Sequence, residues 1–155
     1  MGTRLRIRLM GVIACGVALA LAASDVAAIF IVTEPWVRVG PNGRTAEGYM
    51  ELTSTEGATI VGVKSEITPE VALRQGGSTH AMSPRIELPP GALVKLAPGV
   101  QRLVLTKLNR TLALGDRVGF VFTVESSNGE RQDIAVSAEV RRHSPYDDHL
   151  HAHKH

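Results

Sequence analysis

Two segments near the end of the chain, VGFVFTV (residues 118–124) and DIAVSAEV (residues 133–140), are separated by the polar sequence SNGE (residues 127–130). Valine, isoleucine and phenylalanine recur through both segments, and these side chains fit the pleated surface of a β-strand. Asparagine and glycine accept the backbone angles that tight turns require. This stretch therefore predicts two short strands separated by a turn.

Short apolar segments of the same kind continue back to residue 29, and residues that favour turns bound them. The connections include GPNG (residues 40–43), PPG (residues 89–91) and LGD (residues 114–116), in which proline fixes φ and glycine accepts positive φ. No window keeps a helical apolar stripe for about ten residues. About nine short strands at this spacing predict an all-β fold, an antiparallel β-sandwich. Strands are expected at residues 29–33, 36–39, 48–53, 59–64, 71–75, 85–88, 92–96, 102–108, 118–124 and 133–140.

The first 28 residues have the pattern of a signal peptide. Three arginines precede an almost wholly apolar run at residues 9–23, and small residues follow up to Ala28, after which cleavage is expected. A retained membrane anchor is the competing interpretation, although this run is short for a spanning helix. VIAC (residues 12–15) also resembles a bacterial lipoprotein cleavage box, which would place a lipid on Cys15.

Removal of the signal peptide changes the charge of the chain. It takes away three of the 17 Lys and Arg residues and one of the 15 Asp and Glu residues, which leaves 14 of each. A balanced net charge argues against a nucleic-acid partner or an anionic membrane surface. The single cysteine, Cys15, leaves with the signal peptide. Metal binding by the mature protein must then use histidine, methionine or carboxylates.

Residues 29–140 are expected to form one domain that buries its own core. Residues 141–155 differ in composition, because the alternating pattern ends and five histidines occur in the last thirteen residues. This composition predicts a disordered, flexible His-rich tail.

Several ordered motifs resemble the periplasmic copper chaperones of the PCu(A)C family. They are EPWVR (residues 34–38), AEGYMELT (residues 46–53), the stretch from LPPG to LAPG (residues 88–99), and residues 108–116, which end in GD. The resemblance spans roughly residues 33–140. It implies a cupredoxin-like sandwich in the periplasm that binds Cu(I) and passes it to the copper centres of respiratory oxidases.

The resemblance also implies a copper site made of one histidine, one methionine and a His-x-Met pair. In this chain those positions fall at Arg74, Met82, Arg102 and Val104. Cu(I) prefers soft thioether and imidazole donors, whereas a guanidinium offers no lone pair. Two arginines would also repel a cation. The usual site is therefore expected to be absent, and any copper site is divergent.

His80 and Met82 are the internal candidates for metal ligands. Residues two apart in an extended segment point the same way, so the imidazole and the thioether could share one face. A linear two-donor Cu(I) site is compatible with this pair. In the alternative interpretation, His80 is solvated and Met82 fills a gap at the rim of the core.

The tail supplies further candidate ligands at His149, His151, His153 and His155. Neutral imidazoles on a flexible segment can chelate Cu(II), zinc or nickel, and the entropy lost on ordering limits their affinity. A solubilising tail with incidental metal affinity is the alternative. One or two of these imidazoles could also fold back and complete a site with His80 and Met82.

Arg74 and Arg102 have a second interpretation. Paired guanidiniums can hold a carboxylate or phosphate, or each can meet a nearby acid such as Glu70 or Glu87, or water. Trp36 and Tyr49 are expected to anchor the core. No nucleophile elbow, phosphate loop or HExxH motif occurs, so an enzyme is not expected.

The sequence thus predicts a periplasmic, copper-binding, chaperone-like protein. It would deliver or buffer copper for respiratory oxidase assembly. Its partner would be a copper-accepting protein, such as an oxidase subunit or another copper chaperone. The alternative is a β-sandwich interaction module that has lost copper binding.

Overall fold

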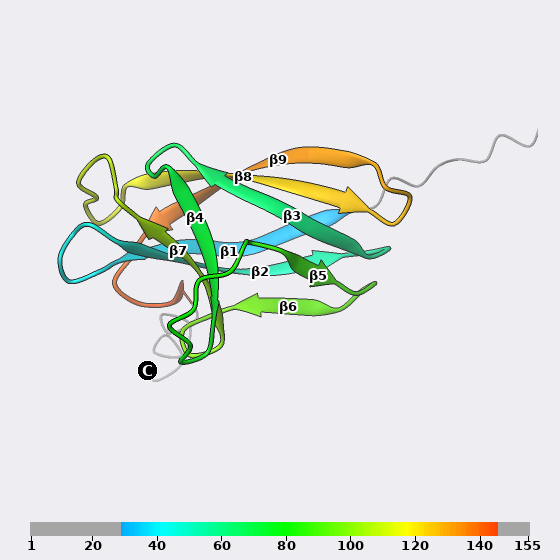
Figure 1. The fold of residues 1–155 in the computed structure, drawn as a ribbon, viewed down its shortest axis with the longest axis horizontal. Helices are drawn as coiled ribbons and strands as arrows, with labels where there is room; N and C mark the ends of the chain where they lie inside the picture. Colours follow the sequence, from blue (N-terminus) through cyan, green and yellow to red (C-terminus); the bar gives the residue numbers. More distant parts are fainter. Residues whose placement is uncertain (1–28, 146–155) are drawn as a thin grey trace, which may run out of the picture.

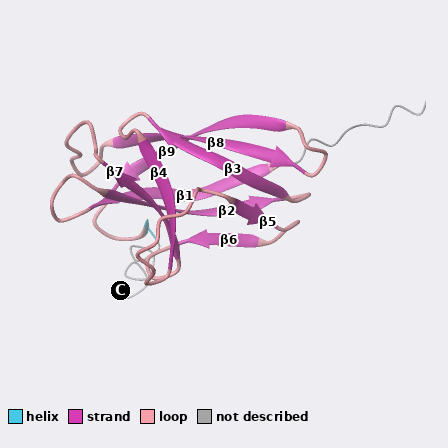
Figure 2. Ribbon diagram, viewed as in Figure 1, coloured by secondary structure: helices cyan, strands magenta, loops and turns pink. Residues whose placement is uncertain are grey.

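The computed structural model describes residues 29–145, and strands make up nearly all of their regular structure (Figures 1 and 2). This arrangement confirms the all-β prediction. The strands are β1 (Phe30–Val39), β2 (Ala46–Ser54), β3 (Ala58–Ser65), β4 (Glu70–Gln75), β5 (Ile86–Leu88), β6 (Leu93–Leu96), β7 (Gln101–Thr106), β8 (Arg117–Ser126) and β9 (Arg131–Val140).

The strands form a single curled sheet in the order β4-β7-β6-β2-β1-β9-β8-β3-β5, and β7 also pairs with β2. Most neighbours are antiparallel, whereas β1 pairs with β9 and β6 with β7 in parallel. The turn between β3 and β4 joins strands near opposite ends of this order, so the sheet folds over itself. In Figure 1, β4 runs across the direction of the long strands β3 and β8. The result is the predicted sandwich.

The predicted strands agree with the observed ones except at the beginning. Residues 29–33 and 36–39 were expected as two strands, but both belong to β1. The pairing of β1 with β2 shifts register between Thr33 and Trp36, and Glu34 has a positive φ of 48°. A bulge of this kind bends a strand without ending it. The bulge explains why one strand has the pattern of two.

The core lies between the facing layers of the curled sheet. Alternate residues of each strand point inward, as the period of a β-strand requires. Gly48 permits close packing here, since a Cβ at this position would lie 3.3 Å from both Leu103 Cβ and Phe120 Cζ. The most deeply buried side chains include Leu52, Ile60, Leu103, Leu105, Phe120 and Phe122.

The described chain enters and leaves at opposite ends of the sandwich (Figure 1). β1 begins at the right of the view, and the segment after β9 ends at the lower left. Among residues 29–145, no helix is long and apolar enough to cross a membrane.

The core predicts a contrast between two neighbours on β8. Phe122 is 0% exposed and Val121 is 36% exposed. Phe122→Ala should lower the free energy of unfolding by about 3–5 kcal/mol, because it removes a buried ring and leaves a cavity. Val121→Ala should cost less than about 1 kcal/mol. Urea unfolding followed by tryptophan fluorescence measures both changes, and equal losses would contradict this description of the core.

Candidate functional site

The positions that the PCu(A)C resemblance assigns to copper ligands lie mainly on the outer face of β4 and β7. In the antiparallel pairing of these strands, Arg74 lies opposite Arg102, and Ala72 lies opposite Val104. Leu73 and Leu103, which lie between them, point into the core and are 3% and 0% exposed. Because side chains alternate along a strand, Arg74, Arg102 and Val104 share the face away from the core.

Glu47 on β2 lies at the centre of this face and binds two arginines. Arg102 Nε donates to Glu47 Oε1 at 2.9 Å, and Arg38 Nη2 donates to Glu47 Oε2 at 2.8 Å. The Tyr49 hydroxyl also donates to Glu47 Oε2. Arg102 is held further by a bond from Nη1 to the Gly76 carbonyl, 2.8 Å long. We call Arg38, Glu47, Tyr49 and Arg102 the Glu47 cluster.

The electrostatics of the cluster keep Glu47 ionised. Burial opposes the charge of this carboxylate, but the hydrogen bonds from Tyr49, Arg38 and Arg102 outweigh it, so the pKa of Glu47 is lowered. The pKa of Tyr49 is raised, first by burial and then by its hydrogen bond to Glu47. Its hydroxyl therefore remains a neutral donor at physiological pH. Hydrogen bonding to Glu47 also raises the pKa of Arg38.

Trp36 and Tyr49 are buried as expected, but they pack outside the main core. Their ring centroids are 4.6 Å apart, and the Arg38 guanidinium lies 5.4 Å from the Tyr49 ring centroid. The two rings thus form an apolar base next to the Glu47 cluster. The prediction that they anchor the core is therefore wrong, because the two rings pack on the outer face.

The acidic partners expected for the arginines are also corrected. Arg102 pairs with Glu47 rather than with Glu70 or Glu87. The Arg74 side chain makes no hydrogen bond or ion pair with any residue between 29 and 145, and its buried Nε has no hydrogen-bond partner there. Arg74 itself is only partly exposed.

Met82 lies against the free edge of β4. Its N–H donates to the Leu73 carbonyl at 2.8 Å, and the Leu73 N–H donates to the Met82 carbonyl at 2.9 Å. Directly paired residues of an antiparallel bridge point to the same face. The Met82 side chain therefore lies on the face of Leu73 and not on the face of Arg74. It is 43% exposed at the rim.

His80 lies two residues before Met82 in the same non-helical segment and is exposed. Its backbone N–H donates to Ser78 Oγ at 3.1 Å. The two soft donors thus occur on one short, accessible segment beside β4. His149, His151, His153 and His155 lie outside the described residues. Within residues 29–145, no group of three or more His, Cys, Asp or Glu side chains is arranged to hold a metal.

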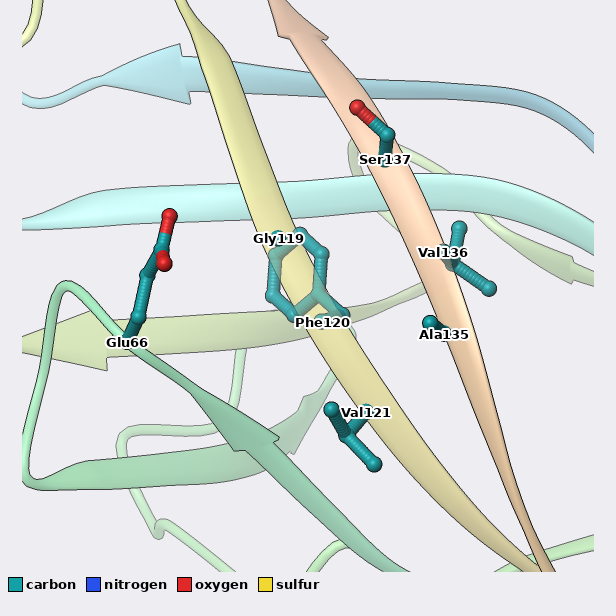
Figure 3. Close-up of a pocket in the computed structure, with 7 residues that line it drawn as sticks. All are labelled: Glu66, Gly119, Phe120, Val121, Ala135, Val136 and Ser137. Atoms are coloured by element: carbon teal, nitrogen blue, oxygen red, sulfur yellow. The ribbon is translucent and has the colours of Figure 1, made fainter.

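A shallow hollow of about 300 Å³ lies on another part of the surface, over β8 and β9 (Figure 3). Its floor is formed by Gly119–Val121 and Ala135–Ser137, and Glu66 lies at its side. Among the described residues that line the hollow, Glu66 is the only titratable one, and none is a soft donor for copper.

The sequence interpretation missed Glu47, although Glu47 and Tyr49 lie two positions apart within the quoted motif AEGYMELT. Residues two positions apart on a strand point to the same side, so this spacing indicates that Glu47 and Tyr49 share a face. The missing information was the pairing of β2 with β7, which places Glu47 opposite Val104 and within reach of Arg102. Such a pairing depends on the register between distant strands.

The Glu47 cluster predicts a pH-dependent loss of stability in Glu47→Gln. The variant should lose about 1–3 kcal/mol of unfolding free energy near neutral pH, because charge-assisted hydrogen bonds are broken. A group whose pKa is lowered by folding stabilises the fold above its ordinary pKa, here 4.5. That contribution is lost as the pH falls through the lowered value. The difference between wild type and variant should therefore shrink below about pH 4.5.

Glu125→Gln is the matched control, since Glu125 forms a surface pair with Arg131 at 2.7 Å. It should cost less than about 1 kcal/mol. Urea titrations between pH 3 and 7 measure both variants. A Glu47→Gln effect no larger than the control, or one that grows in acid, would contradict the role given to Glu47.

The LpqE-like family model, a lipoprotein family, matches residues 30–140. No curated protein is a significant sequence match. The apo PCuAC domain from PmoF1 superposes with a TM-score of 0.62 at 21% identity, over 72% of this chain and 92% of that one. The copper-bound PCuAC domain from PmoF2 gives 0.60 at 22% identity, with the same coverage. Cu(I)-bound DR1885 from Deinococcus radiodurans gives 0.54 at 23% identity, over 77% and 83% of the two chains.

These likenesses confirm the predicted resemblance to PCu(A)C domains and the cupredoxin-like fold. At such identities they establish the fold, whereas the metal ligands have to be judged from the residues of this chain. The family model covers most of the described residues. The chain belongs to the LpqE-like lipoprotein family and has the fold of a PCu(A)C domain.

Proposed function

We propose that this is an exported, copper-binding, chaperone-like protein that holds Cu(I) through His80 and Met82. The observation that carries the proposal is the exposed His-x-Met segment beside β4, where Met82 lies opposite Leu73. Met82 therefore points away from the face of Arg74 and Arg102. The cationic face does not oppose copper capture at this rim.

The chemistry of the two side chains suits a transferable copper ion. Imidazole nitrogen and thioether sulfur are both accepted by Cu(I), and neither has to lose a proton at neutral pH if the histidine is neutral. Met82 is 43% exposed, so a partner can approach the ion and exchange ligands. A copper-accepting protein, such as an oxidase subunit or another chaperone, is the partner that this role requires.

The comparisons support the proposal through the fold. The PmoF2 domain and DR1885 have been solved with copper, and this chain shares their architecture. A lipoprotein family is consistent with export, and it favours lipidation at Cys15 over cleavage after Ala28. The same relationships are consistent with a carrier role rather than catalysis.

The tail would act as an accessory. His149, His151, His153 and His155 lie outside the described residues, and one or two of them would complete the coordination begun by His80 and Met82. Alone, the tail suits Cu(II), zinc or nickel. The proposal therefore distinguishes a Cu(I) site in the domain from a weaker divalent-metal site in the tail.

The first experiment is a competition titration of Cu(I) against a chelator with the untagged mature protein. Met82→Leu keeps the apolar volume but removes the sulfur, and His80→Ala removes the imidazole. Each should weaken Cu(I) binding by at least about tenfold, because a two-donor site cannot lose one donor without losing most of its affinity. The chelator's absorbance reports the affinity.

His143→Ala is the matched control, because His143 is another exposed histidine of the described chain and should leave Cu(I) affinity unchanged. Replacing the four tail histidines by alanine should weaken Cu(I) binding less than Met82→Leu does. If only the tail replacement matters, the assignment to His80 and Met82 is wrong.

The Glu47 cluster favours a second candidate, a β-sandwich interaction module without copper. Two arginines and a valine stand at the positions of expected ligands, and Arg102 is engaged with Glu47. Loading with Cu(I) and desalting separates the candidates. A chaperone retains about one copper per chain, whereas an interaction module retains none.

A further inference from the structure

The part of the outer face around Glu47 and Arg74, to which β1, β2, β4 and β7 contribute, carries more positive than negative charge. Arg38, Arg74 and Arg102 contribute three guanidiniums, and Glu47 is the carboxylate that pairs with two of them. Tyr49 stays neutral because its pKa is raised. Arg74 lies directly opposite Arg102 in the pairing of β4 with β7. Cationic side chains therefore outnumber anionic ones here, and the sheet holds them in fixed positions.

Both oxygens of Glu47 are engaged by other residues, and neither bonds Arg74. Its Oε1 accepts from Arg102, and its Oε2 accepts from both Arg38 and Tyr49. Arg102 is held in place at both its Nε and its Nη1. Arg74 is therefore not part of the hydrogen-bonded Glu47 cluster.

The Arg74 side chain lacks a hydrogen-bond acceptor among residues 29–145. Its Nε is buried without a hydrogen-bond partner among these residues, although the residue as a whole is partly exposed. A buried N–H of a charged group without an acceptor is unfavourable. A neighbouring guanidinium adds repulsion, because like charges at close range destabilise each other. A carboxylate that binds the exposed part of the Arg74 guanidinium would relieve this repulsion.

We propose that Arg74 and the free side of Arg102 form a binding site for a carboxylate group. The planar fork of a guanidinium matches the two oxygens of a carboxylate, and charge-assisted bonds of this kind are strong. The carboxylate comes either from an acidic side chain of this protein's own C-terminal segment, where Asp147 and Asp148 occur, or from a separate molecule.

The site goes beyond the copper proposal and does not depend on it. Met82 follows the face of Leu73, whereas Arg74 and Arg102 lie on the opposite face. A protein that binds no copper would still carry this site. Failure of one proposal therefore leaves the other standing.

The test is an NMR titration of the uniformly ¹⁵N-labelled mature chain with acetate, at constant ionic strength maintained with chloride. The Arg74 Nε–H resonance, assigned by its disappearance in Arg74→Lys, should shift with saturation as acetate is added. The Arg131 Nε–H serves as the matched control, since it is already bonded to Glu125. A shift at Arg131 that equals the shift at Arg74, or no saturable shift at Arg74, overturns the proposal.

Two variants sharpen the result. In Arg74→Lys, the Arg102 backbone amide should report an apparent Kd for acetate about tenfold higher, because the guanidinium fork is lost while the charge remains. An unchanged Kd overturns the role of Arg74. In the double variant Asp147→Asn, Asp148→Asn, a lower Kd than in wild type identifies the tail as the native occupant. An unchanged Kd excludes Asp147 and Asp148 as the occupant and leaves a separate molecule as the source of the carboxylate.

Discussion

The half-buried carboxylate of Glu47 is the constraint on which the functional face depends. A charge in this position is stable only if donors surround it, and three side chains from three strands supply them. Arg38 comes from β1, Tyr49 from β2 and Arg102 from β7. The arrangement ties strands that are distant in sequence. Arg102 also stands at a position where the PCu(A)C resemblance expects a copper ligand, and its guanidinium is already bonded to Glu47.

The alternation of side chains along β4 divides the possible chemistry between two places. Arg74 and its neighbour Arg102 lie on the outer face, whereas Met82 joins the edge of β4 beside Leu73. A cation site and an anion site can therefore exist on the same small domain without opposing each other. The domain has the fold of PCu(A)C domains, and in our two proposals soft donors at the rim bind copper while the arginines of the outer face bind a carboxylate.

Local patterns in the sequence were sufficient for the strands and turns. Val118–Val124 and the segments like it alternate and end at glycine or proline, so their strand character is a local property. The Glu47 cluster is not local, because Glu47 and Arg102 meet only through the register of β2 and β7. The same limit applies to Trp36 and Tyr49, which were expected in the core. Their size predicts burial, but only the bulge near Glu34 and the strand pairing decide which face buries them.

A crystal structure of the Cu(I)-loaded protein, with an anomalous difference map recorded at the copper absorption edge, tests the central claim most directly. The account predicts one strong peak bound by Met82 Sδ and an imidazole nitrogen of His80, with the Glu47 cluster intact. A peak beside Arg102 and Val104 would contradict it, because the outer face would then hold copper despite its arginines. The absence of any peak in the domain would contradict it as well.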